Sequence, residues 1–167
     1  MLSFLFRGLT AEPARGAALF DTVTAEARRP GWYVHGGVPD TLDGRFAVLA
    51  TVTALALLRI ESDGEAGNDA SVALSERFIH VMESEHRELG LGDPTLGKTV
   101  RKLVAMLGRR VELLREAEGD GLEATRESLY KGEVPEEALR HSAAALSELA
   151  GRLERTPLTE LQEGKIA

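Results

Sequence analysis

Apolar side chains recur at helical spacing along most of the chain, and no segment shows the clean alternation of apolar and polar positions typical of a strand. Glycine and proline divide the pattern into six predicted helices, at residues 13–28, 41–60, 71–89, from 94, 122–130 and from 135. The segment from Phe46 to Ile60 is apolar on every face, which is typical of a helix at the centre of a bundle. We therefore predict a single all-α domain, a bundle of six to seven helices with a central apolar helix at about residues 41–60.

The two ends of the chain are set apart from this helical domain, which we place at residues 11–155. Residues 1–10 are an N-terminal apolar segment that either caps the core or lies flat on a membrane surface. Residues 156–167 contain Pro157, which stops or restarts the last predicted helix, and we predict a loose C-terminal tail after it. The longest uncharged apolar run has thirteen residues and is too short for a membrane span of about 20.

Residues 28–40 are predicted to be irregular because they contain two prolines and three glycines. They nevertheless hold Trp32, the only tryptophan of the chain, together with Tyr33. A loop this apolar packs either onto its own core or onto a partner. The central helix begins after it at Asp40 or Thr41, and with Asp40 as the N-cap, Asp43 falls in the first turn at the positive end of the helix dipole.

Charge and composition exclude several classes of function. The chain has 20 Lys and Arg against 27 Asp and Glu, a net charge of −7, which argues against a DNA-coating protein. It has no cysteine, which excludes disulfides and thiolate metal sites and fits a reducing compartment. No acidic residue interrupts positions 98–110, so this predicted helix carries a basic stripe. The stripe is either a solvated face or a surface for an acidic partner, an anionic lipid or ribosomal RNA.

The segment Gly92–Thr99 satisfies the P-loop pattern G-x-x-x-x-G-K-[ST]. That motif needs a buried strand before it and backbone N–H groups around the phosphates. The preceding residues predict a helix instead, and Pro94 removes one backbone donor. We interpret the segment as a helix-capping loop and keep a P-loop-like nucleotide-binding enzyme as an alternative function; a strand before Gly92 would support the alternative.

Other candidate chemistry is weak. His80, Glu83 and His86 lie within seven residues, but the two histidines point about 120° apart on a helix. There is no G-x-S-x-G nucleophile motif, and His35 beside two glycines is interpreted as a turn residue. We therefore predict no metal, no cofactor and no catalytic residue.

Two stretches of the chain carry a resemblance to a known family. The first, residues 28–46, reads R-R-P-G-W-Y-V-H-G-G-V-P-D-T-L-D-G-R-F, close to A-R-x-P-x-(F/W)-Y followed by G-V-P-D-T-x-D-G-R-F. The second, residues 82–101, reads M-E-S-E-H-R-E-L-G-L-G-D-P-T-L-G-K-T-V-R, close to M-D-x-x-L-R-E-x-G-V-G-D-x-x-V-G-K-x-V-K, with Glu83 and His86 as departures. In these stretches the chain resembles the ubiquinol–cytochrome c chaperone family, whose mitochondrial members help newly made cytochrome b into the ubiquinol–cytochrome c reductase.

The resemblance implies a non-enzymatic assembly chaperone of the respiratory chain that binds newly made cytochrome b. It implies the ribosome as a further partner, and action on the cytoplasmic side of the inner membrane with peripheral contact to it. A general helical adaptor that binds an acidic partner is a further alternative. The candidate partner-binding residues come from the two matched stretches and the basic stripe: Arg29, Pro30, Trp32, Tyr33, Asp40, Asp43, Arg45, Arg87, Asp93, Lys98, Arg101 and Lys102.

Overall fold

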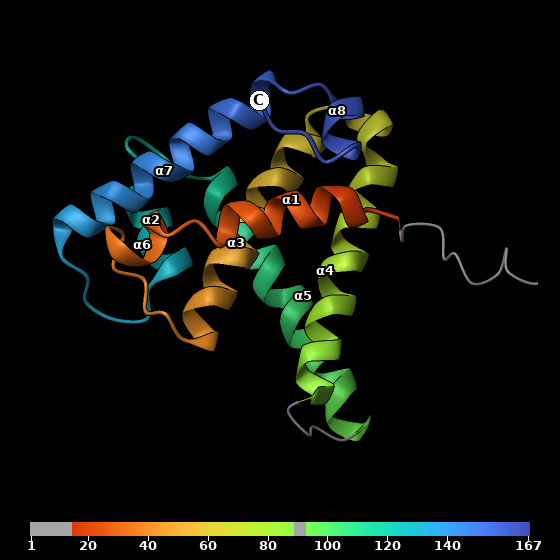
Figure 1. Ribbon diagram of the computed structural model, residues 1–167, viewed down its shortest axis with the longest axis horizontal. Coiled ribbons are helices and arrows are strands. Elements are labelled where there is room, and N and C mark those ends of the chain that lie inside the picture. Colours follow the sequence, from red (N-terminus) through yellow and green to blue (C-terminus); the bar gives the residue numbers. More distant parts are fainter. Residues whose placement is uncertain (1–14, 89–92) are drawn as a thin grey trace, which may run out of the picture.

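The computed structural model describes residues 15–88 and 93–167, and every regular element in that part of the chain is a helix (Figure 1). The predicted all-α fold is confirmed. The described part contains eight α-helices and one 3-10 helix, in this order: α1 (Ala17–Ala27), α2 (Gly31–Val34), α3 (Leu42–Glu61), η1 (Gly64–Gly67), α4 (Asn68–Glu88), α5 (Asp93–Arg115), α6 (Leu122–Leu129), α7 (Glu136–Arg155) and α8 (Leu158–Gln162).

Helix α3 is the centre of the bundle, as the sequence predicts, and it contacts α1, α4, α5, α6 and α7. Apolar residues on all of its sides are buried, which follows from a sequence that is apolar on every face. Two threonines in its middle, Thr51 and Thr53, are also fully buried. Each hydroxyl donates to the carbonyl oxygen one turn earlier, at 2.7 Å in both cases, so neither group is left unpaired in the core.

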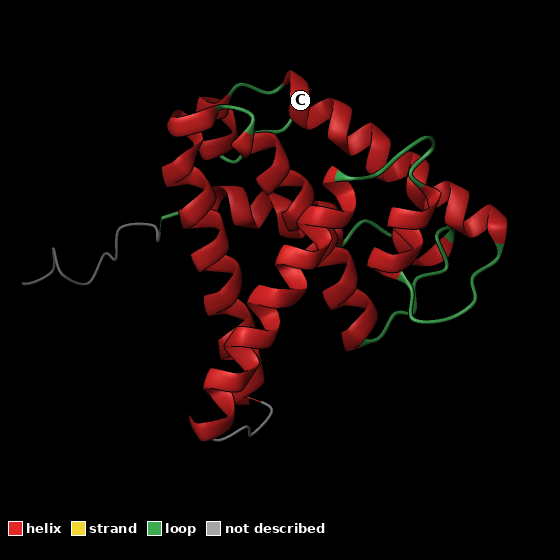
Figure 2. Cartoon of the chain, turned by 180° about the vertical axis from the view of Figure 1, so that it is seen from behind, coloured by secondary structure: helices red, strands yellow, loops and turns green. Residues whose placement is uncertain are grey.

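Helices α4 and α5 form a hairpin that extends beyond the rest of the bundle (Figure 2). Each helix buries one row of apolar side chains at helical spacing. The buried residues are Leu74, Phe78 and Met82 on α4, and Leu103, Leu107 and Val111 on α5. The outer parts of the hairpin are therefore held mainly by the two helices packing on each other, and their opposite faces are open to solvent.

Arg59 on α3 holds the end of α7. Its Nε donates to the carbonyl oxygen of Leu153 at 3.0 Å and its Nη2 to that of Thr156 at 2.9 Å, and a third nitrogen pairs with Asp63. The last carbonyls of a helix lack donors within the helix. The Arg59 side chain, only 11% exposed, donates to both carbonyl oxygens, of which that of Leu153 also accepts the backbone N–H of Thr156, and thereby fixes α7 against α3.

The C-terminal segment differs from the expected loose tail. Residues 158–162 form α8, whose Leu161 is 1% exposed. The hydroxyl of Thr22 on α1 donates to the carbonyl oxygen of Gly164 at 2.6 Å, and the backbone N–H of Ala167 donates to the hydroxyl of Thr156 at 2.9 Å. Pro157 ends α7 and begins a new short helix, because proline is well tolerated at a helix start, and the apolar residues after it pack onto α1.

The segment predicted as irregular contains one helical turn, α2, at Gly31–Val34. Helix α4 begins at Asn68, three residues before the predicted start. The predicted start of the first helix at Pro13 lies outside the described residues. In the part of the chain that the structure describes, no helix is long and apolar enough to cross a membrane.

Candidate partner-binding surface

The aromatic side chains of α2 turn inward. Trp32 is 4% exposed, and its indole N–H donates to the carbonyl oxygen of Glu26 at 2.9 Å. The half-buried Tyr33 donates its hydroxyl to the carbonyl oxygen of Ala27, also at 2.9 Å. Both acceptors belong to the last turn of α1, where carbonyls lack donors within the helix. Of the two readings of this apolar loop, the structure therefore supports packing onto its own core: Trp32 supports the loop and does not offer its ring to a partner.

Tyr130, at the end of α6, fixes the turn that follows α2. Its hydroxyl lies 2.6 Å from the carbonyl oxygen of Gly36 and 2.7 Å from Oγ of Ser142 on α7. Burial raises the pKa of Tyr130, so the hydroxyl stays protonated and can donate. A side chain at position 36 would clash with Oγ of Ser142 and with the carbonyl oxygen of Trp32, so glycine is required there. The turn is thus a rigid part of the surface.

The start of α3 is held by Thr41, the second of the two predicted start positions. The Thr41 side chain accepts a hydrogen bond from the backbone N–H of Gly44 at 3.2 Å, which makes it the N-cap. A side chain at Gly44 would collide with the carbonyl oxygen of Pro39, so the loop can pass this close only because position 44 is glycine. Asp43 lies in the first turn, where a carboxylate suits the helix dipole.

Asp40 and Asp43 form two exposed ion pairs beside this helix start. Asp40 pairs with Nε of Arg45 at 2.7 Å, and Asp43 pairs with Nζ of Lys131 at 2.7 Å. The hydrogen bond from the basic partner holds the pKa of each carboxyl below its ordinary value. Exposed pairs of this kind stabilise a fold only slightly. They leave the region with no net charge, and they bring together three of the predicted site residues.

Apolar side chains remain exposed around this rigid loop. Val34 of α2 is 71% exposed and Leu42, the first residue of α3, is 68% exposed. Arg29 and Pro30 are exposed as well, with Arg29 paired to Glu26 at 3.2 Å. Val34 and Leu42, and not Trp32, are therefore the apolar side chains that this loop exposes to a partner.

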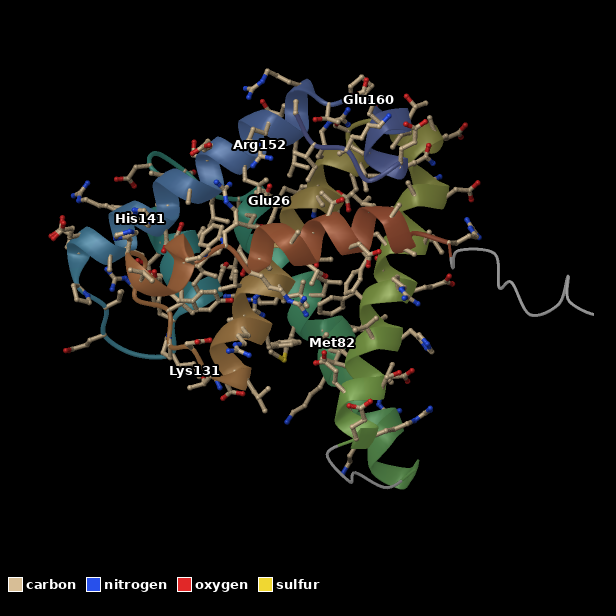
Figure 3. All side chains as sticks on the ribbon, viewed as in Figure 1. Glu26, Met82, Lys131, His141, Arg152 and Glu160 are labelled. Atoms are coloured by element: carbon tan, nitrogen blue, oxygen red, sulfur yellow. The ribbon has the colours of Figure 1, made fainter. Side chains whose placement is uncertain are left out.

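Glu26 links this loop to the other end of the bundle. Its carboxylate pairs with Arg29 and with Arg152 of α7, the latter at 2.9 Å (Figure 3). Burial alone would raise the pKa of Glu26, but hydrogen bonds from Arg152 and Arg29 outweigh it and hold the pKa below its ordinary value. The carboxylate therefore stays ionised and keeps α1 fixed against α7.

Four of the predicted cations lie exposed on the α4–α5 hairpin: Arg87, Lys98, Arg101 and Lys102. None of these four forms an ion pair with a described residue. Arg109, further along the stripe, pairs instead with Glu127 of α6 at 3.0 Å. Asp93 is the first residue of α5, and its side chain is not among the parts that the structure describes. The hairpin thus carries four exposed cations on a chain that is acidic overall.

Arg110 is a notable residue that the sequence analysis missed. Its guanidinium donates to the hydroxyl of Thr51 at 3.3 Å and to the carbonyl oxygens of Met106 at 3.3 Å and Ser128 at 2.9 Å. It lies over the ring of Phe46, 5.9 Å from the ring centre, and burial lowers its pKa. The signal was present in the sequence, because position 110 follows the buried apolar row of α5 at helical spacing, whereas position 109 points outward.

The contact between Phe46 and Arg110 relates the loop to one cation of the hairpin, Lys102. Leu42 lies one turn before Phe46 on the same face of α3, and Lys102 lies two turns before Arg110 on α5. Leu42 and Lys102 therefore lie at the two ends of a stripe that runs over the contact of α3 with α5.

The P-loop arrangement is not formed in the part of the chain that the structure describes. Helix α4 extends to Glu88, and α5 already begins at Asp93. Gly97 and Lys98 consequently lie inside a helix, where backbone N–H groups bond to carbonyls one turn earlier and cannot surround a phosphate. Among the described residues, no three His, Asp or Glu side chains are grouped as metal ligands.

Comparisons with known proteins relate the chain to a family of chaperones. The family described as Ubiquinol-cytochrome C chaperone matches residues 34–167, which include Leu42, the exposed ion pairs and the whole α4–α5 hairpin. The chain is also similar to the crystal structure of the Cbp3 homolog from Brucella abortus, with 26% sequence identity and a TM-score of 0.75 over 100% of this chain and 96% of that one. The chain has no match among curated proteins.

Proposed function

The chain belongs to the ubiquinol–cytochrome c chaperone family, and from this premise we propose that it is a non-enzymatic chaperone that binds newly made cytochrome b. By holding this client it supports the assembly of the ubiquinol–cytochrome c reductase. It acts at the cytoplasmic face of the inner membrane, in peripheral contact with the lipid.

One structural observation supports a binding role most directly. The segment that resembles the family, residues 28–46, is fixed on the bundle by buried aromatic groups and close-packed glycines, yet it leaves Val34 and Leu42 more than two-thirds exposed. A rigid surface with exposed aliphatic side chains loses little conformational entropy when it binds an apolar partner. Newly made cytochrome b is such a partner.

The test of this function combines deletion with capture. Cells without the protein should contain less assembled reductase, and the wild-type gene should restore it. An affinity-tagged wild-type chain should retain cytochrome b in a pull-down, whereas the same tag on an unrelated helical protein should not. Normal reductase assembly in the deletion strain would contradict the proposed function.

The exposed cations of the hairpin support a second contact, with the ribosome that makes the client. Lys98, Arg101 and Lys102 have no ion-pair partner among the described residues, so ribosomal RNA can pair with them without displacing a described acid. Replacing all three with Gln should reduce co-sedimentation with ribosomes, and Arg109→Gln, which removes a paired cation, is the matched control. Equal co-sedimentation of the two variants would contradict this contact.

A further inference from the structure

Arg110 carries a positive charge that no carboxylate balances among the described residues. Partly buried cations in proteins are normally paired, because removing a charge from water is costly. Among the described residues, the guanidinium donates to one hydroxyl and two carbonyl oxygens, which use three of its five N–H donors. Two donors remain for a further acceptor.

The surroundings of this charge are apolar. The half-buried Phe46 lies beneath the guanidinium, the exposed Leu42 lies one turn earlier on α3, and the half-buried Met106 lies one turn earlier on α5. We call Leu42, Phe46, Met106 and Arg110 the α3–α5 surface. It continues along α5 to the exposed Lys102. The surface therefore combines the exposed Leu42 and the half-buried Phe46 and Met106 with a cation that is held in place.

The carboxylates nearest to Leu42 do not supply the missing counter-charge. Asp40 is paired with Arg45 and Asp43 with Lys131, each at 2.7 Å. Both acids therefore already have cationic partners of their own. No carboxylate of the described residues pairs with Arg110, so an acid of a bound partner can take that place.

We propose that the α3–α5 surface seats an apolar segment of the client that carries one carboxylate, and that this carboxylate pairs with Arg110. The inference rests on the proposed function, because it takes cytochrome b as the client and adds the chemistry of the contact. A carboxylate fits the planar donor fork of arginine, and the apolar part of the segment covers Leu42 and Phe46. Three hydrogen bonds hold the guanidinium at the helix crossing, which favours a group inserted from a protein segment over a lipid headgroup that stays at a membrane surface.

The test is photo-crosslinking in cells with a benzoylphenylalanine at position 42. The matched control position is 72, because Val72 is also an exposed aliphatic residue, 50% exposed, but lies on α4. Cytochrome b should be captured at least tenfold more strongly from position 42 than from position 72. Arg110→Gln should reduce the capture from position 42 about tenfold, and Arg109→Gln, its exposed neighbour, should change it less than twofold.

A second pair of variants separates binding from folding, because Arg110→Gln also removes hydrogen bonds within the fold. Leu42→Asp places an acid in the first turn of α3, where it suits the helix dipole and leaves the fold intact. The new acid also offers Arg110 a competing partner and removes an apolar contact. Tagged Leu42→Asp should therefore lose at least nine-tenths of the cytochrome b retained by the wild type at unchanged thermal stability, whereas Val72→Asp should retain it.

The captured segment then tests the chemistry. Mass spectrometry should map the crosslink from position 42 to a segment of cytochrome b with an Asp or Glu. Replacing that acid with its amide should lower capture by wild type and leave capture by Arg110→Gln unchanged, since the partner charge is already gone. Three results would overturn the inference. The mapped segment could lack an acid, the acid-to-amide change and Arg110→Gln could lower capture additively, or position 42 could crosslink only to phospholipid. If the inference fails in one of these ways but wild type still retains cytochrome b in a pull-down, the proposed function is not contradicted. If wild type retains no cytochrome b, the proposed function itself is refuted.

Discussion

Substitution of Trp32 tests whether the apolar loop at residues 28–40 stabilises the fold or binds a partner. The indole is 4% exposed and its N–H donates to the carbonyl oxygen of Glu26 at 2.9 Å. Truncating a buried Trp to Ala costs about 3–5 kcal/mol of unfolding free energy. Trp32→Phe keeps most of the apolar volume but loses the hydrogen bond, which costs about 1–2 kcal/mol. Trp32→Ala should therefore lower the unfolding midpoint by roughly 10 °C, since about 1 kcal/mol corresponds to 2–4 °C in a domain of this size.

The assays are urea denaturation for the unfolding free energy and thermal denaturation for the midpoint, both followed by far-ultraviolet circular dichroism, because both variants lack the only tryptophan and give no tryptophan fluorescence. Val34→Ala is the matched control: it lies two residues away, is 71% exposed, and should stay within about 0.5 kcal/mol of the wild type. A structural role of Trp32 is refuted if the unfolding free energy of Trp32→Ala stays within about 1 kcal/mol of the wild-type value while capture of cytochrome b is lost. The Trp32 side chain would then bind a partner and not stabilise the fold.

Three further predictions concern the contacts that fix the surface. Arg59→Met should lower the unfolding free energy by about 3 kcal/mol in chemical denaturation, because the carbonyl oxygen of Thr156 loses its Arg59 donor, that of Leu153 keeps only the backbone N–H of Thr156, and Asp63 loses its cationic partner; an unchanged midpoint would contradict this. Tyr130→Phe should cost about 1–2 kcal/mol and speed amide hydrogen exchange in residues 31–44, because the turn at Gly36 loses its anchor; unchanged exchange there would argue against the anchor. The lowered pKa of Glu26 contributes stability that is present above pH 4.5, the ordinary pKa, and is lost as the pH falls through the pKa of the folded state. Glu26→Gln should therefore reduce the loss of thermal stability at acid pH. An unchanged loss of stability at acid pH would count against the pair with Arg152.

The pattern of apolar residues was sufficient for the helices and the central position of α3, because a helix that is apolar on all faces has only one place in a bundle. It was not sufficient for residues 28–40. From its sequence, this apolar loop can pack either onto its own core or onto a partner. The structure decides between the two, because Trp32 and Tyr33 donate hydrogen bonds to carbonyl oxygens at the end of α1. The sequence leaves open whether Pro157 stops or restarts the helix. That the residues after it form α8, and not a loose tail, depends on their packing onto α1, which no local pattern reveals.

The candidate site was predictable in part. The family pattern contained Asp40, Asp43 and Arg45, but the pair between Asp43 and Lys131 joins residues 88 positions apart, which no local pattern reveals. Arg110 was overlooked because it belongs to a run of charge, although helical spacing places it with the buried row of α5. Its lack of an acidic partner among the described residues becomes visible only once the neighbouring helices are in place.

The most direct measurement is a pulse-chase experiment that follows labelled cytochrome b through assembly. Immediately after the pulse, labelled cytochrome b should copurify with the wild-type chain, and during the chase it should leave the chain as it enters the ubiquinol–cytochrome c reductase. The Leu42→Asp variant should retain little label at any time, and Val72→Asp should behave as the wild type does. Label that enters the reductase at the normal rate without first residing on the chain would contradict a chaperone role.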